Sequence, residues 1–190
     1  MFKYLTQEEI QKMTFDWRYR GFTTLQLLTE DECDDINDEL EKLRKERQIT
    51  TKENSDGFGE WDPFAYPHRF SQKIEKLFVH PKIIEASEFL MGGKIVGTQS
   101  WAYFKPPGQL GRDQHQNVFY TGCGRNEVIN MALALDNHDS ENGVVWNYEG
   151  SHNLGVLPIE VDEERIKTNP KSWSNERGKP CIMPDNHGFR

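Results

Sequence analysis

Apolar residues recur at helical spacing near the start of the chain. Two Thr-x-x-Glu segments, beginning at Thr6 and Thr29, fit the capping box, in which a hydroxyl and a carboxylate satisfy exposed amides at a helix start. After the second segment, apolar residues follow at steps of three and four among many charged ones: Cys33, Ile36, Leu40 and Leu43. The pattern predicts two helices, the second with one face on a core.

Two further helices and one short strand are predicted before residue 94. One helix covers about residues 71–78. The next begins at Pro81, because proline suits a first helical turn, and ends before Gly92 and Gly93. Residues 22–28 are rich in branched and aromatic side chains, which predicts a strand.

Strand-like segments follow the helices, at residues 94–104, 128–135 and 144–148, each bounded by Pro, Gly, Asn or Asp. Helices grouped ahead of strands indicate an α+β or mostly β fold, a sandwich with a helical cover. Between them, residues 48–69 lose periodicity, and the aromatic stretch 57–68 is a long loop. Such loops are often lids, so we expect this one to cover a site.

Composition and charge exclude several classes of partner. The chain has 190 residues, a formal charge of -8 and a pI near 5.3, so a nucleic-acid partner is not expected. We find neither a signal peptide nor an apolar run that spans a bilayer, which predicts a soluble protein without a membrane partner. Its three cysteines are odd in number and widely spaced, which fits a reducing, cytoplasmic setting.

Residues able to bind metals and anions gather between positions 105 and 157. Side chains two residues apart in an extended segment point to the same side, so His115 and Asn117 can hold one metal ion together. The motifs, in chain order, are Lys-Pro-Pro-Gly from Lys105, His-Gln-Asn from His115, Ala-Leu-Asp from Ala134, Glu-Asn-Gly from Glu141 and Gly-Ser-His-Asn-Leu-Gly from Gly150.

This order of motifs resembles the phytanoyl-CoA dioxygenase family of iron(II)- and 2-oxoglutarate-dependent oxygenases, most closely over residues 96–158. The resemblance implies a double-stranded β-helix, a jelly roll with N-terminal helices packed on one sheet. We therefore expect a single domain over residues 1–190, helical over about 1–93 and jelly roll over about 94–190. It also implies iron(II), 2-oxoglutarate and a small-molecule substrate that is hydroxylated while succinate and carbon dioxide are released.

The resemblance also assigns site residues. Family members hold the metal with His-x-Asp and a distal His, a triad that leaves open positions. His115 falls on the first His, and Asn117 falls on the carboxylate ligand. Because an amide oxygen carries no charge, we expect a lower affinity for iron. The candidate cosubstrate-binding positions are Trp101, Lys105 and Ala132, the last standing where many members place an aromatic residue.

The C-terminal part departs from the family pattern. Members carry the distal His and a cosubstrate-binding Arg on strands well beyond the Gly-Ser-His turn. Here 38 residues follow His152, with four prolines and little alternation, so the closing strands are expected to be missing. His187 and Arg190 are the remaining His-then-Arg pair, but they are spaced too closely for either role to carry over. His152 itself is expected to be structural or near substrate.

Other interpretations of these candidate site residues stay open. Trp101, Tyr103 and Phe119 fit a substrate cavity, but aromatic residues at alternating strand positions are more often part of a sandwich core. Lys105 fits a purely structural turn, because two prolines follow it. Asp113 has the mirror-image spacing to His115 and is an alternative carboxylate ligand.

Three hypotheses of function remain. The first is an oxygenase with a weakened metal site. The second is a non-catalytic relative that binds a small acid or a protein, and the third is a piece of a longer enzyme. Halogenases also lack the carboxylate, but they have a small residue there, and Asn117 is larger.

Overall fold

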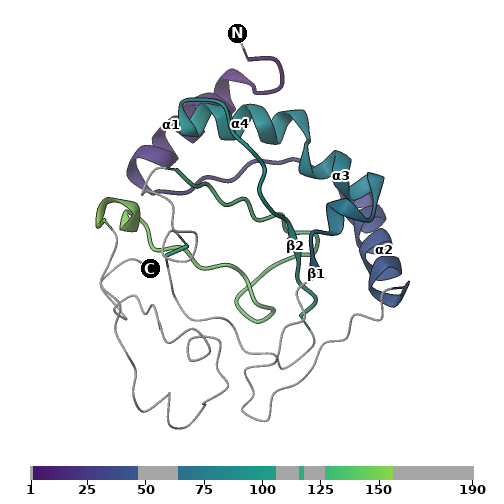
Figure 1. Cartoon of the computed structure of the whole chain (residues 1–190). Coiled ribbons are helices and arrows are strands. Elements are labelled where there is room, and N and C mark those ends of the chain that lie inside the picture. The colour runs from purple at the N-terminus through teal and green to yellow at the C-terminus, as the bar shows by residue number, and fades with distance from the viewer. Residues whose placement is uncertain (1, 47–63, 106–115, 118–126, 156–190) are drawn as a thin grey trace.

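The structure is a computed structural model that describes residues 2–46, 64–105, 116–117 and 127–155. Figure 1 shows helices α1 and α4 side by side along one edge, α2 and α3 along the adjoining edge, and extended segments below them. The elements, in order, are α1 (Gln7–Tyr19), α2 (Glu30–Glu46), β1 (Phe64–Ala65), the 3-10 helix η1 (Pro67–Arg69), α3 (Gln72–Phe78), α4 (Pro81–Met91), β2 (Trp101–Ala102) and the 3-10 helix η2 (Ser151–Asn153).

Both predicted capping boxes are present. Thr6 Oγ1 accepts a hydrogen bond from the amide of Glu9 at 3.2 Å, and the carboxylate of Glu9 accepts one from the amide of Thr6 at 2.9 Å. Thr29 and Glu32 repeat this exchange at 3.3 and 2.8 Å at the start of α2. The starts of α1 and α2 therefore follow from local sequence, as predicted.

The two later helices are also confirmed. Ser71 caps α3 through its hydroxyl, which accepts from the amide of Ile74. His80 caps α4, and its Nδ1 accepts from the amide of Lys82 at 3.2 Å. Helix α4 ends at Gly92, whose φ of 70° lies in the left-handed region that glycine adopts without steric cost.

Two clusters of buried side chains hold the helices to the extended segments. The α1–α4 cluster consists of Leu5, Met13 and Ala86, with Ile10, Leu25, Phe89 and Leu90 packed against it. The sheet cluster lies between α2, α3 and the two strands, and consists of Ile36, Leu40, Leu43, Phe64, Ile74 and Ala102, with Leu28, Leu77, Phe104 and Leu135 at its edge.

The predicted strands differ from the structure. Of residues 94–104, Trp101–Ala102 alone is strand, and the described segments 22–28, 128–135 and 144–148 contain none. Residues 22–28 owe their apolar pattern to packing, since Leu25 enters the α1–α4 cluster and Leu28 the sheet cluster. A strand also needs a backbone partner, which side-chain alternation does not supply.

The prediction of a loop over residues 57–68 is wrong for Phe64 and Ala65. Phe64–Ala65 forms β1, which pairs antiparallel with β2 in the register Phe64 to Ala102 and Ala65 to Trp101. The amide of Tyr66 extends the contact by donating to the carbonyl of Ser100 at 2.8 Å. A two-residue strand shows no periodicity, so its pairing with a distant segment left no signal. Trp61 and the rest of the predicted lid lie outside the described residues.

Within the described part of the chain, no helix has the length and apolar character needed to cross a membrane.

Candidate functional site

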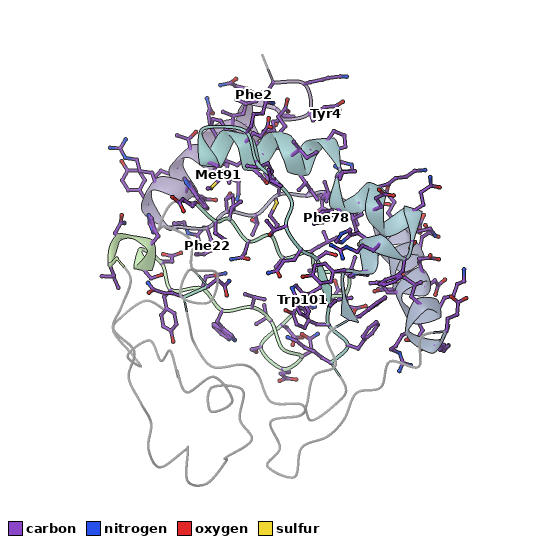
Figure 2. All side chains as sticks on the ribbon, viewed as in Figure 1. Phe2, Tyr4, Phe22, Phe78, Met91 and Trp101 are labelled. Carbon is purple, nitrogen blue, oxygen red and sulfur yellow. The ribbon has the colours of Figure 1, made fainter. Side chains whose placement is uncertain are left out.

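Strand β2 and the residues after it present two different faces. Ala102 is buried in the sheet cluster, and Phe104 packs against the same cluster. Because side chains alternate along an extended segment, Trp101, Tyr103 and Lys105 point to the opposite side. Trp101 is 41 % exposed and Tyr103 is 49 % exposed, and Figure 2 shows Trp101 below the helices, at the strand pair. Neither aromatic belongs to the sheet cluster.

A second segment, residues 131–135, contacts the helices at both of its ends. The sulfur of Met131 accepts a hydrogen bond from Ser87 of α4 at 3.0 Å. Leu135 packs on the sheet cluster, and its carbonyl accepts from Asn37 of α2 at 3.1 Å. Met131, although 51 % exposed, and Leu135 thus contact the helices, and the alternation of side chains along an extended segment places Ala132 on the other side.

We call this side of residues 101–105 and 131–135, turned away from the helices, the helix-distal face. All three candidate cosubstrate-binding positions, Trp101, Lys105 and Ala132, lie on it. A ligand bound between these segments would meet side chains that the helical core does not use.

The motif segments make contact in pairs. Lys105 Nζ donates a hydrogen bond to the carbonyl of Gly143 at 2.6 Å. The contact is close, since a Cβ on Gly143, whose φ is +89°, would lie 3.0 Å from the same nitrogen. Lys105 therefore links residues 101–105 to the Glu-Asn-Gly turn.

The second contact joins the His-Gln-Asn segment to the Gly-Ser-His turn. Gln116 Nε2 donates to the carbonyl of Gly155 at 2.8 Å, and Asn117 next to it is exposed. His115, Asp113, His187 and Arg190 lie outside the described residues. Within the described ranges, no group of three His, Cys, Asp or Glu side chains is placed to hold a metal ion.

His152 packs against helix α1. Its Nε2 lies 3.2 Å from the carbonyl of Arg18, and a Cβ on Gly21 would lie 2.3 Å from its Nδ1. The side chains of Arg20 and Glu149 approach to 2.6 Å beside it. This arrangement matches the structural role expected for His152.

Residues near Trp101 were missed by the sequence reasoning. His68 stacks on Phe78 with ring centroids 4.3 Å apart, and its Nδ1 lies 2.5 Å from Ser100 Oγ. Burial and the nearby Arg69 lower the pKa of His68, which favours the neutral imidazole. Tyr66, with a φ of 58°, lies between the His68 and Trp101 rings. No spacing in the sequence links these positions.

Cys33 is not a candidate nucleophile. Burial first, and then the acidic residues around it, raise the pKa of its thiol and keep it protonated. Cys123 and Cys181 lie outside the described residues.

Comparison with family models gives a match to Phytanoyl-CoA dioxygenase (PhyH) over residues 17–184. The chain belongs to the phytanoyl-CoA dioxygenase family. The match is wider than the region 96–158 on which the motifs alone were compared, and it includes α2, α3, α4 and residues beyond 159. Searches of curated proteins and of solved structures returned no match.

The phytanoyl-CoA dioxygenase family generally depends on iron and 2-oxoglutarate, so His115 and Asn117 are the candidate metal ligands of this chain. An imidazole nitrogen and an amide oxygen are both donor types found around iron(II), and Asn117 is accessible to solvent. The donors therefore fit the metal by type. They supply one negative charge fewer than the His-x-Asp pair, so the fit is weaker by charge.

Proposed function

We propose that this chain is a non-haem iron(II)- and 2-oxoglutarate-dependent dioxygenase on a jelly-roll scaffold, which hydroxylates a small molecule and binds its metal weakly. The observation that carries the proposal is the family match, because residues 17–184 include every motif position. The placement of three candidate cosubstrate positions on the helix-distal face supports it.

The residues of this chain have defined tasks in the proposal. His115 and Asn117 would hold iron(II), which with 2-oxoglutarate and oxygen supplies the oxidising power for hydroxylation. Trp101 and Tyr103 present aromatic surface on the helix-distal face, where they exclude water from a bound substrate. Lys105 donates to the carbonyl of Gly143, so residues 101–105 stay attached to the Glu-Asn-Gly turn.

Asn117 sets the strength of metal binding. A unit charge at ligand distance is worth several kcal/mol even at an effective dielectric constant of about 20. The Asn117→Asp variant should therefore bind iron(II) more than about tenfold more tightly than the wild type. Asn137→Asp adds the same charge in an exposed segment outside the site, and should leave the affinity unchanged.

The test is an anaerobic titration of iron(II) with 2-oxoglutarate present, followed in the visible region, and a succinate assay after oxygen is admitted. Wild type should give a weak band and slow release of succinate, and Asn117→Asp a stronger band. If neither protein binds iron(II) nor forms succinate, the dioxygenase proposal is wrong.

Asn117 favours a second candidate, a non-catalytic relative that keeps the fold to bind a small acid or a protein. In that case Asn117→Asp should stay inactive, and iron(II) should leave the melting temperature of both proteins unchanged. Turnover in Asn117→Asp would exclude this candidate.

A further inference from the structure

The Gly-Ser-His turn, residues 149–155, is attached to the molecule at both ends. Its first end lies on the C-terminal end of α1, and its second end touches Gln116. The two contacts are separated by a few residues of hydrogen-bonded turn.

At the first end, four neighbouring contacts join the turn to helix α1. The amide of Gly150 donates to the carbonyl of Arg20 at 2.9 Å, and the guanidinium of Arg20 lies 2.6 Å from Glu149. A carbonyl can only accept, so His152 Nε2 donates to Arg18 O, 3.2 Å away. Its ring covers Gly21, where no side chain would fit.

The turn is closed by its own backbone hydrogen bonds. The amides of Ser151, Asn153 and Leu154 each donate to the carbonyl three residues earlier, at 3.0 to 3.1 Å. Gly150 and Gly155, at its two ends, have φ values of 76° and 78°. Glycine adopts this conformation without steric cost, so these two positions suit glycine.

At the second end, the carbonyl of Gly155 accepts the hydrogen bond of Gln116 at 2.8 Å. Gln116 directly precedes Asn117. The orientation of Gln116 is thereby linked, through six residues of turn, to the end of α1.

We propose that the end of helix α1 and residues 149–155 form a positioning device for the segment that carries Asn117. His152 and Glu149 are positioning residues: they hold the turn, and the turn holds Gln116. The role of this device in metal binding rests on the proposed function, while the coupling between α1 and Gln116 does not.

The coupling is tested by hydrogen exchange on wild type, His152→Ala, Glu149→Gln and the control Asn153→Ala, which changes an exposed side chain of the same turn. Exchange in a peptide containing Gln116 and Asn117 should accelerate at least about threefold in the first two variants, with no change in a peptide from α4. The control should match wild type. Unchanged exchange at Gln116 in His152→Ala overturns the proposal.

A second readout separates positioning from general destabilisation. In a manganese(II) titration, His152→Ala should bind at least about threefold more weakly, and His152→Gln, whose amide can donate to Arg18 O, should recover most of the affinity. Equal affinities in wild type and His152→Ala would remove the metal-positioning role. If wild type itself binds no metal, the proposed function fails, and hydrogen exchange still decides the coupling.

Discussion

Asp16 is the residue on which the C-terminal end of α1 depends. Its carboxylate is buried, yet it accepts hydrogen bonds from Lys12 at 2.8 Å and Thr23 at 3.0 Å. Burial alone would raise its pKa, but these bonds and the positive charges of Lys12 and Arg20 outweigh burial and lower the pKa below 3.8. Asp16 therefore stabilises the fold at neutral pH in its charged form.

We expect Asp16→Asn to reduce the free energy of unfolding by about 2 kcal/mol, because hydrogen bonds to a buried charged group are lost. Chemical denaturation at pH 7 measures this. Asp35→Asn is the matched control, since Asp35 forms an exposed ion pair with Lys73 and its loss should cost less than about 1 kcal/mol. Equal effects of the two substitutions would contradict the importance of burial at Asp16.

Helix starts are set at the scale of the element. Thr6 and Thr29 each exchange two hydrogen bonds with the glutamate three residues on, so both helices begin where the capping box begins. A cap satisfies amides that have no partner inside the helix. The effect is local and does not depend on what the helix packs against.

Thr6→Ala should therefore destabilise the protein by about 1 kcal/mol, the usual cost of losing such a cap. Thr14 lies within the same helix, where its hydroxyl bonds back to the carbonyl of Ile10. Thr14→Ala should be neutral or slightly stabilising, because alanine is the better helix former. Thermal unfolding followed by circular dichroism compares the two, and a larger loss for Thr14→Ala would refute this account of the helix start.

At the scale of the whole molecule, the N-terminal segment is held to α4 by one carboxylate. Glu85 accepts hydrogen bonds from the amides of Lys3, Tyr4 and Leu5 at 2.7, 2.7 and 2.9 Å. Phe2 packs edge-on against Phe89 of the same helix, and Figure 2 shows Phe2 and Tyr4 beside α4. Burial opposes the charge on Glu85, but the three amides prevail and lower its pKa.

Because the pKa of Glu85 is lower in the folded state, its stabilising effect is complete above the usual value of 4.5 and is lost as the pH falls through the lowered value. Glu85→Gln should therefore melt at a lower temperature than wild type at pH 7, and the difference should close in acid. Melting curves from pH 7 to pH 3 measure it. Glu88→Gln, on the same helix, should stay close to wild type, and a Glu85→Gln difference that persists at pH 3 would contradict the assignment.

Local signals in the sequence were enough to predict the four α-helices and the family. The caps at Thr6, Thr29 and Ser71, and the left-handed glycine at Gly92, act on amides and carbonyls a few residues away, so their effect can be read from spacing. The motifs between residues 105 and 157 predicted the family, and the match over residues 17–184 confirmed it. The jelly roll and the metal ligands stay predictions.

Long-range contacts had no such signal. Arg20 and Glu149 are 129 residues apart, and Gln116 and Gly155 are 39 apart. The pairing of β1 with β2 joins a segment predicted as loop to two residues of the segment 94–104 that was predicted as a strand, and no pattern linked the two. Spacing along a chain reports which residues share a face of one element, whereas the meeting of two elements depends on the path between them. The tertiary structure alone therefore showed that helix α1, the Gly-Ser-His turn and Gln116 are connected.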